Sequence, residues 1–419
     1  MHSLEKIFIS KSSIIKVCLL GAAYFVEQVG SYGLYIWIAR GYGPLEYSYF
    51  TIALVLTKVV FGVTEMGLQP VVTRELAKKS LESAEIIHNT IVIRLITTLS
   101  TAVALNFVVH WMLYPDSIKV GVKIFSIYMV LLHVSNLNLA VLRGKELQNL
   151  MAFIMLSGSI STFLLASWLI MVRSDLRYVQ MAFVLGAFIQ TLFGYYHQKE
   201  SFYSFKFNYS YCVEILKKSL PYGLVAISSF IYFRIDEVMI SFFYPETDYV
   251  GIYDAAYTVF YATAFVPMIL HHIFLPFFSR LHTNSLNILK KSYYQLMMIV
   301  LVYSILLCSG IFFFSEPMIL IIYGNKYLDS VEVLQVLMIG GVFLSLSFTV
   351  ITTLIAIDKG LILLRIVGFS AILNVALNIV AIPGYGYMGA AVTTIITETF
   401  LAIVGICYLK NYFLNRIRC

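Results

Sequence analysis

Long apolar runs, separated by short polar breaks, recur along the whole 419-residue chain and restrict the folds open to it. A helix that crosses the hydrocarbon core of a membrane needs roughly 20 mostly apolar residues. Hydrophobic residues make up 60% of the chain, and Asp, Glu, Lys and Arg together make up 12%. That charged share is about half of what a soluble domain carries. The composition therefore argues against a soluble fold.

Apolar runs bounded by charged residues, glycines and prolines predict about twelve membrane-spanning helices. The first six are expected at Ile14–Ala39, Tyr47–Gln69, Ile86–Tyr114, Ile118–Leu142, Leu150–Val172 and Tyr178–Tyr196. The second six are expected at Tyr222–Phe243, Gly251–Phe278, Leu289–Phe314, Val331–Ile357, Leu361–Ile382 and Met388–Leu409. The expected fold class is an all-α integral membrane protein, with no room for a sizeable soluble domain.

The distribution of Lys and Arg between the loops predicts the orientation. Twenty of the 29 basic residues lie on the side that holds both termini, six lie on the other side, and three fall inside spans. Cytoplasmic loops carry the excess of positive charge, so both termini are expected in the cytoplasm. The net charge of +7 is spread between apolar segments. A stripe of the kind that binds nucleic acid is absent from the sequence pattern, and no nucleic-acid partner is expected.

A short pattern recurs at an offset of 206 residues and indicates two duplicated halves, expected as 1–205 and 206–419. The matching residues are Tyr47, Pro70 and Arg74 around the second span, and Tyr253, Pro276 and Arg280 around the eighth. Six spans per half is an even number, so both halves insert the same way up. Transporters built from parallel repeats place the substrate path between the repeats. We therefore expect two parallel six-helix bundles around a central cavity.

Several motifs in a fixed order support a family resemblance. The first half carries Tyr42-Gly43-Pro44-Leu45-Glu46-Tyr47, Glu65-Met66-Gly67-Leu68 and Thr73-Arg74-Glu75-Leu76-Ala77. The second half carries Pro221, Ile235-Asp236, Val250-Gly251-Ile252-Tyr253-Asp254-Ala255-Ala256, Pro276-Phe277-Phe278-Ser279-Arg280-Leu281, Tyr323-Gly324-Asn325-Lys326-Tyr327, Asn374 with Asn378, and Ile382-Pro383-Gly384-Tyr385-Gly386 leading to Gly389-Ala390-Ala391. Together these resemble the Wzx-type polysaccharide flippases of the multidrug/oligosaccharidyl-lipid/polysaccharide exporter superfamily.

The resemblance implies a transporter that moves undecaprenyl-pyrophosphate-linked repeat units of O-antigen or capsule polysaccharide. It implies movement from the cytoplasmic to the periplasmic leaflet of a bacterial inner membrane. The polymerase and ligase of the same pathway are then candidate partners. At one motif position this chain has Glu65, where the family often has Asp. The difference in side-chain length weakens any role of this residue that depends on how far the carboxylate reaches.

Ionisable residues inside spans are the candidate functional residues, because burying a charge in hydrocarbon is costly unless it faces a cavity or a partner. A pyrophosphate head group needs buried cations, and a guanidinium can bind two phosphate oxygens at once. Arg234, Lys58 and Arg94 are therefore the candidate substrate-binding residues. Two alternatives stay open: Arg234 could instead neutralise Glu237, three residues away on one helix face, and Lys58 could reach an interface.

Export of about two negative charges from a negative interior gains roughly 2.3 kcal/mol per charge per 100 mV, so ion coupling is optional. If a proton or Na⁺ is exchanged, the candidate carriers are Glu27, Glu65, Asp236 and Glu398. Each could equally be a structural partner. Asp236 is turned by roughly 200° from Arg234 around the helix axis, so Asp236 and Glu237 need not share a role.

No catalytic residue, metal site or cofactor is expected. The five cysteines are far apart and form no CxxC pair. The run Gly384-x-Gly386-x-x-Gly389 lies between two apolar spans, so it predicts a tight loop with close helix packing and not a dinucleotide site. Two other functions stay open. One is a multidrug or other small-molecule exporter of the same superfamily, and the other is a membrane-embedded polysaccharide polymerase or glycosyltransferase, although no loop is long.

Overall fold

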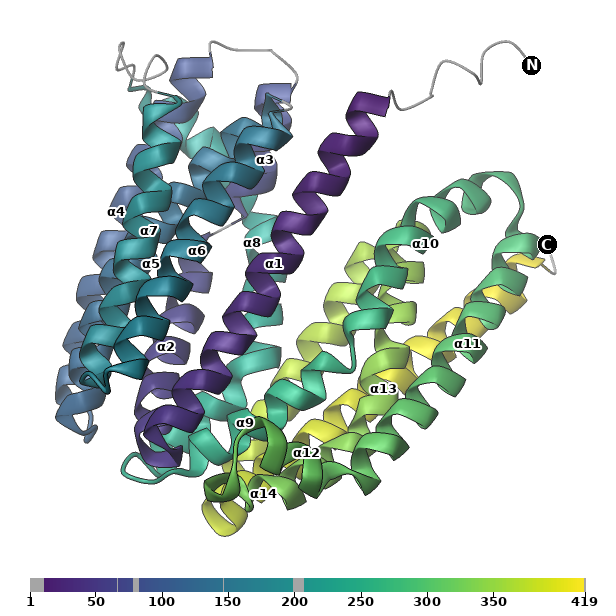
Figure 1. Ribbon diagram of the computed structural model, residues 1–419. Helices are drawn as coiled ribbons and strands as arrows, with labels where there is room; N and C mark the ends of the chain where they lie inside the picture. Colours follow the sequence, from purple (N-terminus) through teal and green to yellow (C-terminus); the bar gives the residue numbers. More distant parts are fainter. Residues whose placement is uncertain (1–10, 66, 78–82, 146, 199–206, 418–419) are drawn as a thin grey trace. The chain divides into compact units, whose positions relative to one another are not determined.

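Helices are the only regular elements in the residues that the structure describes, which are 11–65, 67–77, 83–145, 147–198 and 207–417 (Figure 1). This computed structural model confirms the expected all-α class. The expected boundary between residues 205 and 206 lies outside the described residues. The contacts divide the chain into an N-terminal unit, Met1–Gly41 with Ala53–Ile227, and a C-terminal unit, Tyr42–Ile52 with Ser228–Cys419.

The N-terminal unit is built mainly from seven helices, of which α5 and α7 are the most connected. α5 packs against α3, α4 and α7, and α6 packs along α7. The helices are α1 (Lys11–Tyr42), α2 (Pro44–Glu65), α3 (Leu68–Ala77), α4 (Ser83–Trp111), α5 (Asp116–Gly144), α6 (Gln148–Met171) and α7 (Leu176–Tyr196). α8 (Tyr209–Phe243) runs from this unit into the C-terminal one.

The C-terminal unit is organised around α13, which packs against α9, α10, α11 and α14 (Figure 1). Its helices are α9 (Tyr249–Ala262), α10 (Phe265–Asn284), α11 (Leu286–Phe313), α12 (Ser315–Ile322), η3 (Asn325–Tyr327), α13 (Ser330–Ala356) and α14 (Gly360–Ile417). The first turns of α2, within Tyr42–Ile52, also belong to this unit.

A helix covers most of each of the twelve expected spans. Among the described residues, eight helices are long and apolar enough to cross a membrane, or nine if the bent pair α9–α10 is one span. The chain is therefore a multi-pass membrane protein.

Three breaks differ from the expected spans. The second span ends at Glu65, four residues early, and Gly67 follows it with a positive φ of 65°. The eighth span is bent by 44° between α9 and α10. Pro267, in the first turn of α10, has no N–H to donate to the preceding turn, so the helix cannot continue smoothly there. The eleventh and twelfth spans form one long α14, interrupted at Gly386.

The loop around Gly386 is tight, as the glycine spacing predicts. Gly386 has a φ of 56°, a conformation in which glycine avoids the steric cost that a side chain would bring. A Cβ at Gly389 would lie 2.5 Å from the carbonyl oxygen of Ala381. The glycines thus let α14 fold back on itself.

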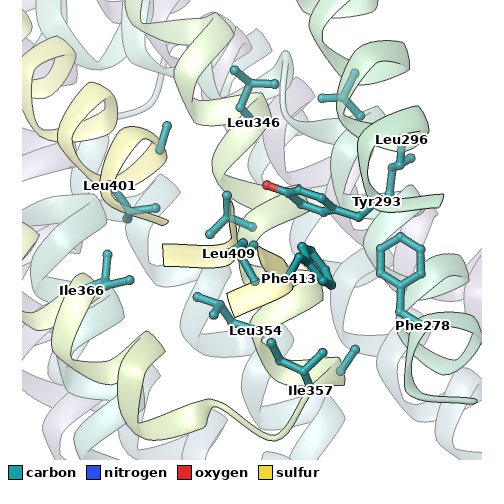
Figure 2. Packing of buried hydrophobic residues seen from close by; sticks show 14 of the residues in the cluster. Phe278, Tyr293, Leu296, Leu346, Leu354, Ile357, Ile366, Leu401, Leu409 and Phe413 are labelled. Carbon is teal, nitrogen blue, oxygen red and sulfur yellow. The ribbon is translucent and has the colours of Figure 1, made fainter. Parts of the chain in front are cut away.

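Buried aromatic and aliphatic side chains fill the interior of the C-terminal unit. Figure 2 shows Tyr293 of α11 beside Phe413 of α14, with ring centroids 5.6 Å apart, and Phe278 of α10 nearby. Leu354 and Leu409 extend this cluster across α13 and α14. In a membrane the lipid is as apolar as these side chains, so close van der Waals packing holds the helices together.

Small residues allow a close helix approach in the N-terminal unit, between α6 and α7. A Cβ at Gly158 would lie 3.0 Å from the Gly186 carbonyl oxygen, and a Cβ at Gly186 would lie 2.8 Å from the Gly158 carbonyl oxygen. The two glycines therefore face each other, with backbone against backbone.

Replacing Gly186 by Val should destabilise the protein, because the new side chain would force α6 and α7 apart. We expect a loss of about 1–3 kcal/mol, measured as a lower thermal unfolding midpoint of the purified protein in detergent. Gly368→Val is the matched control, since a Cβ there meets nothing within 4 Å. Equal midpoints for the two variants would contradict the proposed packing.

Candidate functional site

An arginine held by two carboxylates lies inside the C-terminal unit. The Arg234 Nη1 atom of α8 is 2.5 Å from Glu237 Oε1 and 3.2 Å from Asp254 Oδ1 of α9. The ion pair of Arg234 with Glu237, which the sequence left open as an alternative, is thus present. The Arg234 side chain is 29% exposed, whereas those of Glu237 and Asp254 are 1% and 7% exposed. The guanidinium also lies over the Tyr257 ring, 5.6 Å from its centroid.

The start of α2 completes this cluster. Tyr47 is buried, and its hydroxyl donates to Asp254 Oδ2 at 2.5 Å. The next residue, Ser48, accepts a hydrogen bond from the Gly251 N–H at 2.7 Å. A Cβ at Gly251 would collide with the Pro44 carbonyl oxygen, so glycine is needed where α2 meets α9. Both oxygens of Asp254 therefore have a donor. We call Arg234, Glu237, Asp254 and Tyr47 the arginine cluster.

Asp236 lies in a separate polar network with α14. Its Oδ1 accepts from Asn378 Nδ2 at 2.6 Å, and its Oδ2 accepts from Thr394 Oγ1 at 2.7 Å and Tyr253 OH at 2.8 Å. Asn378 Nδ2 also donates to Asn374 Oδ1 at 3.0 Å. These donors are all uncharged, so they hold the carboxylate without neutralising it.

Glu398 lies one turn after Thr394 in α14, next to Tyr232 and within electrostatic range of Asp236. Glu398 is 3% exposed. The structure thus places Arg234, Asp236 and Glu398 in the C-terminal unit. Asp236 contacts α14, and Glu398 is part of it.

Two candidates of the N-terminal unit, Arg94 and Glu65, lie within electrostatic range of each other. Arg94 of α4 is 1% exposed, donates through Nη1 to the Thr64 carbonyl oxygen at 3.3 Å and interacts electrostatically with Glu65. Its Nε and Nη2 atoms have no hydrogen-bond partner among the described residues. Arg94 is closed to a large ligand in this structure.

The other two N-terminal candidates both lie near Tyr35 of α1. Lys58 Nζ donates to Tyr35 OH at 3.3 Å and lies 5.6 Å from its ring centroid. Glu27 lines a cavity of about 360 Å³ formed by α1, α5, α6 and α7, together with Tyr35, Tyr128 and Gln190. Most of the remaining lining is apolar or aromatic. Lys58 and Glu27 are both partly exposed.

Sequence reasoning missed most of the uncharged members of these networks, and it also missed Asp254. Asp254 and Asn378 were visible only as motif residues, Tyr47 only as a motif and repeat position, and Thr394 was not singled out at all. One signal was available: Tyr47 and Tyr253, the repeat pair, are both buried, and each donates its hydroxyl to a carboxylate. A repeated buried tyrosine in an apolar segment requires a hydrogen-bond partner.

Several solved membrane transporters and flippases share this fold. A multidrug resistance MATE family transporter of the MOP superfamily, inward-facing, matches with a TM-score of 0.76 at 15% identity, over 93% of this chain and 95% of that one. The lipid II flippase MurJ, inward closed, matches with a TM-score of 0.77 at 16% identity, over 95% and 89%. A MOP superfamily transporter from Pyrococcus furiosus matches with a TM-score of 0.66 at 14% identity, over 95% and 94%. The chain thus has the fold of the MOP superfamily.

The family follows from a sequence match. The model described as "Polysaccharide biosynthesis protein" matches residues 38–332, and the chain belongs to this family. Two uncharacterised membrane proteins of Methanocaldococcus jannaschii are similar in part. MJ1375 is 23% identical over 46% of this chain and 45% of its own length, and MJ1068 is 31% identical over 25% and 21%. The chain thus spans less than half the length of either relative.

Replacing Arg234 by Met should destabilise the protein, because two buried carboxylates would lose the cation that neutralises them. Breaking a buried ion pair on one side costs about 3–5 kcal/mol, measured from unfolding in mixed detergent micelles. The double variant Arg234→Met, Glu237→Met should recover part of that loss. Lys291→Met, at an exposed site, is the control. A single variant as stable as the control would show that the ion pair does not hold this cluster.

Proposed function

We propose that the chain is a Wzx-type flippase for lipid-linked oligosaccharides. The observation that carries the proposal is the match of residues 38–332 to the polysaccharide biosynthesis family, on a fold shared with the lipid II flippase MurJ. The substrate is an undecaprenyl-pyrophosphate-linked repeat unit, moved from the cytoplasmic to the periplasmic leaflet of a bacterial inner membrane. Both termini lie in the cytoplasm, as the basic loops favour.

Two cations are proposed to contact the pyrophosphate head group. Arg234 and Lys58 are partly exposed, so each can reach a ligand. Arg94 takes a lesser part, because it is enclosed beside Glu65. A phosphate that binds Arg234 has to compete with Glu237 and Asp254 for the guanidinium. The head group is therefore held loosely enough to leave, which a transport cycle requires.

Asp236 is the proposed position of ion coupling, with Glu398 as its neighbour. Its carboxylate is surrounded by hydroxyl and amide groups, which supply the oxygen ligands that Na⁺ or a proton relay would use. Glu65 is assigned a structural role beside Arg94. Glu27 remains a candidate carrier in the cavity of the N-terminal unit.

Two alternatives compete with this proposal. A small-molecule exporter would share the fold, as the MATE neighbour illustrates, but the match to the polysaccharide biosynthesis family favours a saccharide-linked substrate. A membrane-embedded polymerase or glycosyltransferase would be an enzyme, whereas the structures with this fold are transporters and flippases. We therefore propose a non-enzymatic transporter that works with the polymerase and ligase of the same pathway.

The flippase proposal predicts a specific defect in the native host. Removing the protein should leave lipid-linked oligosaccharide on the cytoplasmic leaflet, measured by leaflet-resolved labelling of the glycan. Arg234→Gln with Glu237→Gln, combined with Lys58→Gln, should reproduce the defect at normal protein level, because the head group would lose both cations. Lys291→Gln is the control. Normal export in the deletion strain would exclude flipping, and normal export by the variant would exclude the two cations as the head-group site.

Ion coupling at Asp236 is tested by gradients imposed on vesicles that contain the purified protein. Wild type should respond to a pH or Na⁺ gradient, and Asp236→Asn should lose that response while it still follows voltage. The reason is that asparagine preserves the size of the side chain but binds neither ion as a carboxylate does. Glu316→Gln, at an exposed site, should behave as wild type. A wild type that follows voltage alone would remove Asp236 and the other acids from this role.

A further inference from the structure

The charges of the arginine cluster do not balance. One guanidinium faces two carboxylates, Glu237 and Asp254, which are both nearly inaccessible to solvent. With all three groups ionised, the cluster carries one net negative charge inside the C-terminal unit of a membrane protein. Such a charge costs several kcal/mol unless a proton or another cation neutralises it.

The hydrogen bonds differ between the two carboxylates. Asp254 accepts from Arg234 on Oδ1 and from Tyr47 on Oδ2. Glu237 accepts from Arg234 on Oε1, but its buried Oε2 has no hydrogen-bond partner among the described residues. Asp254 is therefore the better stabilised carboxylate, and Glu237 is the group on which an added proton costs least.

The two carboxyl groups share one donor atom, because Arg234 Nη1 lies 2.5 Å from Glu237 Oε1 and 3.2 Å from Asp254 Oδ1. Two ionised carboxylates are both acceptors, so they can form no hydrogen bond to one another. A single proton on one of them creates that bond and removes the repulsion, as in pairs of acids that share a site. A proton on Glu237 Oε2 would give this oxygen a partner and leave the bond from Tyr47 to Asp254 intact.

We propose that the Glu237–Asp254 pair takes up one proton when a phosphate group of the substrate binds Arg234. This inference rests on the proposed function, since it takes a pyrophosphate head group as the anion. The phosphate draws the guanidinium away from Glu237. The proton comes from the aqueous solution and binds Glu237, and the protonated carboxyl group then donates a hydrogen bond to Asp254. When the phosphate leaves, the proton returns to water and the ion pair with Arg234 forms again.

The groups that face Glu237 allow this exchange. Arg234 approaches it along α8, Asp254 and Tyr257 approach it from α9, and Tyr47 reaches Asp254 from α2. Asp236 is the next residue on α8, but its carboxylate is engaged by α14. Among these groups, Arg234 is the cation, so its capture by a phosphate leaves the carboxyl pair in need of a proton.

Thermodynamic linkage between proton binding and anion binding fixes the direction in which pH changes the affinity for the anion. If anion binding takes up a proton, lower pH must strengthen anion binding by the same coupling factor. The bound proton also reduces by one the negative charge that moves with the head group. Glu237→Gln imitates the protonated acid, so this variant should bind the anion tightly at every pH.

The test uses inorganic pyrophosphate and the purified full-length protein in detergent. Calorimetry in two buffers of different ionisation enthalpy gives the protons taken up per bound anion. We expect wild type to take up as much as one proton more than Glu237→Gln, and to bind more weakly at mildly alkaline pH, by about 5-fold or more. Protons that pyrophosphate itself takes up cancel in this difference. Glu332→Gln, at an exposed site, should match wild type.

Three outcomes separate the inference from the proposed function. Equal proton uptake by wild type and Glu237→Gln, with binding that depends on Arg234, would overturn the proton linkage and leave the head-group site standing. Binding unchanged in the double variant Arg234→Gln, Glu237→Gln would overturn both, because the anion would then bind elsewhere. Loss of the extra proton in Glu237→Gln, with binding retained, would support the inference.

Discussion

A charge buried in a membrane protein needs a partner, and in the C-terminal unit Glu237 and Asp254 are the partners of Arg234. Arg234 would be costly alone, and Glu237 and Asp254 would be costly without it. The ion pairs of Arg234 with Glu237 and Asp254 join α8 to α9, and the hydroxyl of Tyr47 adds the start of α2 to the same cluster. Two consecutive helices and a segment 207 residues away are thus held by four polar side chains, where hydrophobic burial gives little drive.

The helical period of α8 separates two kinds of polar chemistry. Arg234 and Glu237 share one face and meet α9, whereas Asp236 points elsewhere and meets Asn378 and Thr394 of α14. One site pairs charge with charge, and the other surrounds a charge with neutral donors. Two neighbouring acids, Asp236 and Glu237, can therefore respond to different ligands without a direct conflict.

The sequence predicted the local part of this arrangement but not the long-range part. Helical spacing alone predicted the pair Arg234–Glu237 and the turn of Asp236 away from it. Apolar periodicity predicted helices at all twelve segments, because lipid-spanning helices satisfy their own backbone. The sequence could not predict that Asp254 contacts Arg234, or that Tyr47 donates a hydrogen bond to Asp254, 207 residues away. Such contacts depend on packing between helices, and the sequence of an apolar segment does not show which other helix packs against it.

The assignment of Tyr42–Ile52 to the C-terminal unit means that the chain passes from one unit to the other three times and not once. Neither unit is a continuous stretch of polypeptide. A gene split between α7 and α8 would encode a C-terminal fragment in which Asp254 lacks the Tyr47 hydroxyl and Tyr327 lacks the Tyr47 ring. Residues 42–52 would then be encoded with the other fragment, so the C-terminal fragment would depend on it for folding.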